Sequence, residues 1–208
     1  MTAKDCIKGR RSIRKFKKDP IDPAVLSDLV ETASYAPSWK HTQIARYIAV
    51  SGALKDQLAA ECTAAYPHNG EIITQAPVLI VVTYIKNRSG FERDGSYSTS
   101  KGGSWQMFDA GIASQTFALA AYEQGIGSVI MGIFDEEKVA SLLNLPEDRE
   151  VAALIPIGYP DEAPVAPKRK PVEDLLSFQE SKSFTLRFFM EKRKDWRKYE
   201  TSYEPSGF

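Results

Sequence analysis

The sequence predicts an α+β fold, and three observations carry that prediction. The chain has 208 residues, of which 43% are apolar and 26% charged, an ordinary balance for one medium-sized globular domain. The segment Val78–Ile85 is continuous, apolar and rich in β-branched residues, which is typical of a strand buried on both faces. Elsewhere apolar residues recur at helical spacing, so helices and strands are expected to share one core.

The first half of the chain is predicted to contain helices separated by a strand. We expect a short helix over Ala3–Lys8. Asp22-Pro23 supplies an N-cap and a first helical residue, and the helix that follows is expected to run to about Tyr35. A strand is predicted over Arg46–Ser51. A second helix is predicted over Ala53–Ala65, with an apolar face formed by Leu54, Leu58, Cys62 and Ala65.

The second half begins with a long polar loop. Residues 86–104 are rich in Gly and Ser, and loops of this length often cover or form a binding site. Phe108–Glu123 is predicted to be a helix that ends at Gly125. Its small residues lie on every side, so we expect it to be buried and to let another helix approach closely. The other predicted elements are a strand at Ser128–Met131, a helix capped by Asp135 that runs through Leu143, and a strand at Glu150–Ile157.

The composition excludes several classes of protein. Lys and Arg number 27, as do Asp and Glu, so no bulk electrostatic attraction to nucleic acid is expected. No apolar run reaches the length of a membrane span, and the N-terminus has no apolar core of a signal peptide. Cys6 and Cys62 have neither the number nor the spacing of a disulfide framework or a metal site. We therefore expect a cytoplasmic protein with two packed thiols and no metal.

Four segments carry residue types that a flat, phosphate-bearing ligand needs. The first holds three guanidinium groups and a hydroxyl, at Arg10, Arg11, Ser12 and Arg14, and such cations repel one another unless an anion lies among them. The second, Ala36–Gln43, is a helix-ending loop dense in hydrogen-bonding side chains. The third, Gly125–Phe134, has glycines that let a backbone approach a flat ligand. The fourth, Pro167–Pro171, holds three cations on an arm whose prolines exclude a helix.

Each segment alone also has a plain structural explanation. The arginines would form a solvated basic turn, Gly125 and Gly127 a helix stop and a turn, and Lys168–Lys170 a solvated charge run. The glycine spacing does not match G-x-G-x-x-G, and no G-x-x-x-x-G-K-[ST] occurs, so the common nucleotide-binding loops are excluded. The prediction of a binding site therefore depends on the segments acting together.

Together and in this order, the segments resemble the FMN-dependent nitroreductase family, from about Lys8 to Pro171. The matching stretches are R-R-S-I-R, A-P-S-x-x-x-x-Q, N-x(5)-Q-A-P-V-x-I-V-V, D-A-G-I-A-S-Q, G-I-G-S followed by F-D-E-E-K-V, L-P-E-D-R-E-V, I-G-Y-P and K-R-K-P. The resemblance implies a nitroreductase-like fold, with a central, mostly antiparallel sheet flanked by helices. It also implies a C-terminal arm that wraps the partner subunit of a homodimer.

The resemblance further implies two FMN sites at the seam between the subunits. Arg14 is the candidate for stabilising negative charge at the N1–C2=O edge of the flavin, since a cation there favours hydride acceptance. The family has Asn where His41 stands and Pro-Trp where Ile44-Ala45 stand, so the detailed pocket is expected to differ. The residues implied to hold FMN are Arg10, Arg11, Ser12, Arg14, Pro37, Ser38, Trp39, His41, Asn69, Met131, Gly132, Ile133, Lys168 and Arg169.

These residues have different implied roles. The arginine segment and Lys168-Arg169 hold the phosphate and the pyrimidine edge, while Pro37–His41 reach the flavin from the other subunit. Asn69 contacts the pyrimidine side, and Met131–Ile133 turn their backbone toward flavin N5. No catalytic side-chain nucleophile is required because the flavin carries the chemistry. His68 is expected to be a loop residue rather than a metal ligand.

The implied activity is that of an NAD(P)H-dependent flavin oxidoreductase. Hydride would pass from NAD(P)H to flavin N5 and then to an electron-poor acceptor, such as a nitroaromatic or a quinone, by a ping-pong mechanism. Two alternatives stay open: a non-catalytic flavin-binding redox sensor, and a protein that binds a partner or a nucleic acid through its basic tail. Residues 1–171 are expected to form the FMN-binding domain, and residues 172–208 the arm and an amphipathic basic tail.

Overall fold

A computed structural model describes residues 1–179 of the chain, which fall into two units, Met1–Val165 and a second one that begins at Ala166. The elements of the first unit are α1 (Ala3–Gly9), α2 (Pro23–Ala33), the 3-10 turn η1 (Trp39–His41), β1 (Ala45–Val50), α3 (Gly52–Cys62), α4 (Pro67–Gln75), β2 (Val78–Ile85), α5 (Ser104–Glu123), β3 (Gly127–Ser128), α6 (Glu136–Leu142) and β4 (Arg149–Gly158). The described part of the second unit contains the short 3-10 helix η2 (Val172–Asp174). The predicted domain boundary after residue 171 stays a prediction.

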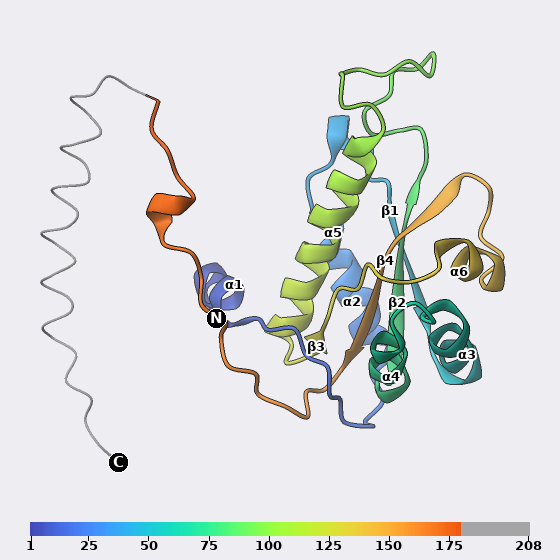
Figure 1. Cartoon of the computed structure of the whole chain (residues 1–208), viewed down its shortest axis with the longest axis vertical. Helices are drawn as coiled ribbons and strands as arrows, with labels where there is room; N and C mark the ends of the chain where they lie inside the picture. The colour runs from blue at the N-terminus through green and yellow to red at the C-terminus, as the bar shows by residue number, and fades with distance from the viewer. Residues whose placement is uncertain (180–208) are drawn as a thin grey trace, which may run out of the picture. The chain divides into compact units, whose positions relative to one another are not determined.

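The sheet has the strand order β1-β2-β4-β3, and every pair is antiparallel. This confirms the predicted α+β fold with an antiparallel sheet flanked by helices. Strand β2 is an inner strand, and its side chains alternate between the two faces. Val78, Ile80 and Val82 pack with residues of α2 and α5, whereas Leu79 and Val81 pack with residues of α3, α4 and α6. In Figure 1, α2 and α5 lie on one side of the sheet and α3, α4 and α6 on the other. Burial of both faces of β2 thus explains why its apolar run is continuous.

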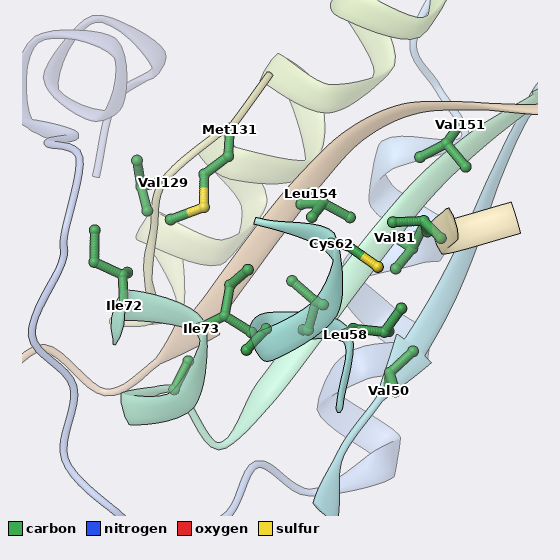
Figure 2. Packing of buried hydrophobic residues seen from close by; sticks show 14 of the residues in the cluster. Val50, Leu58, Cys62, Ile72, Ile73, Val81, Val129, Met131, Val151 and Leu154 are labelled. Atoms are coloured by element: carbon green, nitrogen blue, oxygen red, sulfur yellow. The ribbon is translucent and has the colours of Figure 1, made fainter. Parts of the chain in front are cut away.

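The core on the α3–α4 side also holds the chain that follows β3. Figure 2 shows Leu58 and Cys62 of α3, with Ile72 and Ile73 of α4, gathered against the sheet. Val129 and Met131 belong to the same cluster, and Met131 is 4% exposed. The segment after β3 is therefore anchored by apolar packing before it reaches the surface.

Helix α4 was not predicted, and it changes the interpretation of α3. Its sequence offers only two adjacent apolar residues and an Asn-Gly pair, so no helical spacing is visible. The expected apolar face of α3 included Leu54, but this side chain is 40% exposed and Lys55 is buried instead. The Lys55 ammonium donates to the carbonyls of Ile73 (2.9 Å) and Thr74 (3.1 Å) at the end of α4. A cation is favoured there by the helix dipole. His68, expected in a loop, lies on α4.

Helix α5 differs from its prediction in two ways. It starts at Ser104, one turn before the expected Phe108. It is also buried on only part of its surface, not on every side as expected. Met107 is 50% and Phe108 59% exposed, and open space surrounds Gly111 one turn further on. Gly125 ends the helix as expected, with a left-handed φ of 75°. Among the described residues, no helix is long and apolar enough to cross a membrane.

The predicted helix caps and the packed thiols are confirmed, while helix α2 is shorter than expected. The carboxylates of Asp22 and Asp135 accept backbone N–H groups of the helices that they precede. Helix α2 ends at Ala33 rather than near Tyr35. Cys6 and Cys62 are both free and buried.

Lys55→Ala is expected to lower the free energy of unfolding by about 1–3 kcal/mol, because it leaves the last carbonyls of α4 without their buried donor. Asp56→Asn is the matched control. Asp56 is the exposed ion-pair partner of Lys55 at 2.8 Å, and a surface pair contributes at most about 1 kcal/mol. Urea denaturation measures both variants, and equal losses would contradict the capping role.

Candidate functional site

The chain from Arg10 to Arg14 lies along β3 and alternates inner with outer side chains. Ser12 forms a parallel bridge with Ser128, and the Ile13 N–H donates to the Ser128 carbonyl at 3.0 Å. Ile13 is 7% exposed and packs on Gly127, where a Cβ would come within 2.8 Å of Ile13. Since successive side chains of an extended chain point to opposite sides, positions 10, 12 and 14 share the outer face.

Arg11 is largely used by the end of α1. Its Nη1 donates to the carbonyls of Lys8 (2.6 Å), Gly9 (3.1 Å) and Arg10 (2.9 Å), and its Nε is buried with no partner among the described residues. The side chains on the outer face make fewer hydrogen bonds. In the described part of the chain, the Arg10 guanidinium and the Ser12 hydroxyl have no hydrogen-bond partner, and Arg14 makes one contact of 3.4 Å to the Ser12 carbonyl.

The backbone after Met131 is the second component of this region. The N–H and C=O of Met131 both bond to Leu154, at 2.9 and 3.1 Å, so this N–H is not available to a ligand. Gly132 and Ile133 have no backbone N–H partner within residues 1–179, and no atom lies within 4 Å of where a Cβ on Gly132 would be. Asn69, 8% exposed, donates from Nδ2 to the Ile133 carbonyl at 3.0 Å and fixes this backbone. We call Arg10, Ser12, Arg14, Asn69, Gly132 and Ile133 the cationic half-site.

The turn over residues 36–43 is the other predicted region, and we call it the turn half-site. Lys40, His41 and Gln43 have φ values of 45°, 58° and 47°. A left-handed conformation costs a residue other than glycine roughly 1–2 kcal/mol, so the surroundings must hold this turn. One such contact is internal, because the Gln43 N–H donates to the Ser38 hydroxyl at 2.9 Å. A pocket of about 320 Å³ opens beside the turn, with Pro37 and Ser38 in its wall.

Asp109 of α5 holds the turn and was not identified from the sequence. This carboxylate is 4% exposed, and its Oδ2 accepts from the Trp39 N–H at 2.9 Å and from the Ser89 hydroxyl at 2.5 Å. The Ser89 hydroxyl also lies 2.8 Å from that of Thr42. One carboxylate therefore joins α5, the turn half-site and the loop after β2. The available signal was an acidic residue in an otherwise apolar stretch of helix.

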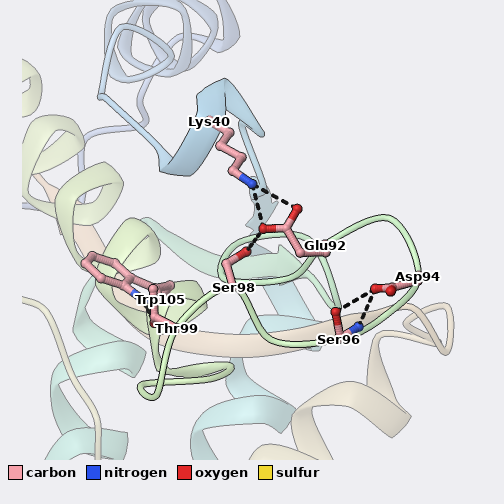
Figure 3. Close-up of polar contacts among 7 residues, drawn as sticks. All are labelled: Lys40, Glu92, Asp94, Ser96, Ser98, Thr99 and Trp105. Carbon is pink, nitrogen blue, oxygen red and sulfur yellow. Dashed lines mark hydrogen bonds and ion pairs between the residues drawn. The ribbon is translucent and has the colours of Figure 1, made fainter.

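The loop between β2 and α5 is organised by its own polar contacts and reaches the turn half-site. Figure 3 shows Glu92 between Lys40 and Ser98: its carboxylate accepts from the Lys40 ammonium at 2.8 and 3.1 Å, and from the Ser98 hydroxyl at 2.5 Å. These hydrogen bonds lower the pKa of Glu92. At the base of the loop, the Trp105 indole donates to Thr99 at 2.9 Å. The loop thus forms an ordered wall beside the turn.

The two half-sites lie toward opposite ends of α5 (Figure 1). Asp109 supports the turn half-site, and Tyr122 supports the end of α1, where a Cβ on Gly9 would overlap its hydroxyl at 2.3 Å. Residues 109 and 122 are thirteen positions apart, and at 1.5 Å per position these two points of the helix are about 20 Å apart. One chain therefore does not bring the turn half-site and the cationic half-site together.

Comparison with known proteins decides the family. The pattern of the nitroreductase family matches residues 7–71 and 63–159, which is most of the chain. The chain belongs to the nitroreductase family. A Bacillus subtilis relative named as an NAD(P)H nitroreductase, YfhC, is 32% identical over 186 residues, covering 82% of this chain and 91% of the relative.

Solved structures agree with this nitroreductase assignment. A nitroreductase family protein from Clostridium novyi NT has a TM-score of 0.66 at 29% identity, over 78% of this chain and 87% of its own. A Desulfovibrio desulfuricans protein named as a nitroreductase, solved in complex with FMN, has a TM-score of 0.67 at 26% identity, over 85% of this chain and 96% of its own.

Two predicted groups of this nitroreductase family member are not placed against the half-sites. Lys168 and Arg169 belong to the second unit, where Arg169 donates to the Pro167 carbonyl at 3.4 Å. The basic tail beyond Lys182 lies outside the described residues. The roles implied for these groups, and for each of the other site residues, stay predictions.

Asp109→Ala is expected to lower the free energy of unfolding by about 1–3 kcal/mol, because the Trp39 N–H and the Ser89 hydroxyl lose their charged acceptor. It should also raise amide hydrogen exchange in residues 38–43. Asp94→Ala is the control: Asp94 is exposed and bonds only within its own loop, to Ser96. Unchanged exchange over residues 38–43 in Asp109→Ala would mean that the carboxylate does not hold the turn.

Proposed function

We propose that the chain is an FMN-dependent oxidoreductase that passes hydride from NAD(P)H to an electron-poor acceptor. One observation carries the proposal. The outer side chains of Arg10, Ser12 and Arg14 have few or no partners among the described residues. The strand that carries them is joined to the open backbone of Gly132-Ile133 through Ile13 and Met131, which pack in one core cluster. A cluster of permanent cations calls for an anion, and an open glycine backbone admits a flat ring.

The residues present fit FMN. Arg10 and Ser12 offer donors for its phosphate. Arg14 would hold positive charge against the N1–C2=O edge, while the N–H groups of Gly132 or Ile133 would meet the N5 edge. FMN, when bound, supplies the hydride chemistry, and the protein supplies orientation and charge. Met131 supports this backbone through the sheet rather than through its own N–H.

The second half of each site is proposed to come from a partner subunit. Nitroreductase family members are typically homodimeric. Within one chain the half-sites are separated along α5, and the exposed stripe of Met107, Phe108 and Gly111 lies near the turn half-site. A two-fold pair that covers this stripe would bring the turn of one chain to the cationic half-site of the other, and it would create two equal sites. Pro37, Ser38, Trp39 and His41 would then meet the flavin held by the partner.

The proposed reaction has two halves that use the same face of the ring. NAD(P)H would bind first and leave oxidised, and a nitroaromatic, a quinone or a similar acceptor would then take its place, which is a ping-pong scheme. The Lys40–Glu92 wall is proposed to border this shared space. A cytoplasmic location stays part of the proposal.

Anaerobic addition of NADH or NADPH to the FMN-loaded protein is expected to bleach the flavin absorbance within seconds, and a nitroaromatic should restore it. Turnover numbers of about 1–10³ s⁻¹ are ordinary for enzymes. Absorbance spectra measure both halves of the reaction. A protein that binds FMN tightly but is bleached by neither nucleotide would be a flavin-binding sensor, and the catalytic proposal would be wrong.

Replacing Arg10 and Arg14 together by Ala is expected to yield colourless protein, because the two free cations of the outer face are lost. Arg11→Ala is the matched comparison. It should lower the melting temperature, since three carbonyls at the end of α1 lose their donor, and it should keep much of the flavin. Flavin content and thermal melting distinguish the two roles. Full flavin retention in the double variant would show that the pocket is elsewhere.

A further inference from the structure

The backbone of Arg14 is held by the side chain of Glu162. The Oε1 atom of this carboxylate accepts from the Arg14 N–H at 2.5 Å and from the Lys15 N–H at 3.2 Å. Hydrogen bonds to an ionised acceptor are about twice as strong as those between neutral groups. One carboxylate therefore fixes two consecutive peptide groups, and the first of them carries the Arg14 side chain.

Arg14 lies between two stretches that are paired through their backbones. Before it, Ile13 is bonded to β3, and after it, residues 15–17 pair with residues 159–161. In the described part of the chain, the Arg14 N–H has no backbone acceptor, and Glu162 is its only partner. Without this carboxylate, the peptide group between the two paired stretches would have no anchor of its own.

The Arg14 side chain has little to hold it except this backbone. Its one hydrogen bond to a described residue, from Nη1 to the Ser12 carbonyl, is long at 3.4 Å. No ion pair joins its guanidinium to Glu162 or to any other acid of residues 1–179. The positive charge therefore stays uncancelled, and the place that it occupies is set by the peptide group that Glu162 fixes.

A carboxylate at this position can affect a flavin in two opposite ways. Reduced FMN carries negative charge at the N1–C2=O edge, so the charge of Glu162 acting directly would disfavour the reduced form. Glu162 acting through a well-placed Arg14 would favour it, since a cation fixed in advance stabilises the charge that develops on the ligand. The geometry supports the second effect, because Glu162 is bonded to the peptide group and leaves the guanidinium free.

We infer that Glu162 is a positioning residue for Arg14 and thereby favours reduced over oxidised FMN. It holds the Arg14 peptide group so that the guanidinium meets the N1–C2=O edge, and it does not touch the ligand itself. The inference rests on the proposed function. It is measured by the dissociation constant of oxidised FMN divided by that of reduced FMN, which we call the redox preference. A ten-fold change in this ratio equals a shift of about 30 mV for a two-electron couple.

The test compares the redox preference of the wild type with that of Glu162→Ala, Glu162→Gln and Asp161→Asn, all as full-length proteins. Oxidised and chemically reduced FMN are titrated anaerobically into the flavin-free proteins, at a pH at which the reduced form is anionic, and circular dichroism checks folding. Asp161→Asn is the matched control. It removes the same charge one residue away, and the hydrogen bond from the Asp161 N–H to the Lys15 carbonyl does not involve the side chain.

The wild type separates a failure of this inference from a failure of the proposed function. Wild-type protein that binds no FMN, or whose bound FMN is not reduced by NAD(P)H, would contradict the proposed function, and the inference would fall with it. Where the wild type binds FMN and is reduced, the variants decide the inference alone.

Glu162→Ala is expected to lower the redox preference about ten-fold, through weaker binding of reduced FMN, because Arg14 is no longer held at the ring edge. Glu162→Gln should lower it about two- to three-fold, since a neutral oxygen still accepts both N–H groups but more weakly. Asp161→Asn should not lower it. An unchanged or increased redox preference in whichever Glu162 variant folds, or an equal fall in Asp161→Asn, would overturn the inference.

A double-mutant cycle with Arg14→Ala tests the route of the effect. Arg14→Ala should itself lower the redox preference, because the cation at the ring edge is lost. If Glu162 acts only by positioning that cation, Glu162→Ala should cause no further fall in the Arg14→Ala background. A further fall as large as that in the wild-type background would mean that the two residues act independently, and the positioning role would be wrong.

Discussion

The packing of Ile13 on Gly127, together with the hydrogen bond from the Ile13 N–H to Ser128, is the constraint on which the candidate site depends. It sets the register of the arginine segment against β3. A shift of one residue would exchange the two faces of the segment. Arg11 and Ile13 would then face outward, and the side chains of Arg10, Ser12 and Arg14 would be turned into the core. A buried apolar contact therefore decides which cations can meet a ligand.

Two carboxylates also fix the backbone of the candidate site. Asp109 holds the strained turn, and Glu162 holds the backbone of the cationic strand. Neither is ion-paired with an arginine of the site in the described part of the chain. The chain as a whole is neutral, yet its acidic residues fix peptide groups here rather than cancelling the charge of the site. Positive charge is thereby kept available at a defined place, which is the condition for electrostatic preorganisation.

The sequence predicted those elements whose signals are local. The apolar run of β2, the caps at Asp22 and Asp135 and the stop at Gly125 each depend on a few neighbouring residues. Helix α4 has no such signal, since it is held by contacts with α3. Lys55 illustrates the limit further: only the fold shows that the end of a distant helix lies within reach of its ammonium.

The sequence was enough to predict which segments form the candidate site. It was not enough to predict which of their residues hold the structure and which stay free for a ligand. The three arginines of residues 10–14 look equivalent in the sequence, and they separate into one structural and two outward-facing residues only when β3 is beside them. The resemblance implied that the backbone of Met131–Ile133 faces the flavin, and the structure shows that both backbone groups of Met131 bond to Leu154. The next residue, Gly132, has the open backbone. A motif identifies the segment, and the pairing of strands decides which of its atoms remain free.

The strained turn gives the last argument for a site shared between subunits. Three left-handed residues within four positions cost several kcal/mol if each costs roughly 1–2 kcal/mol, and a buried carboxylate is used to hold them. Nothing in the cationic half-site of the same chain uses this strained shape, because about 20 Å of α5 lies between them. Such strain is retained where a particular arrangement of backbone and side chains is needed. A turn that is held so firmly, beside an exposed apolar stripe and away from its own chain's cationic half-site, supports the proposal that it meets a flavin held by a second chain.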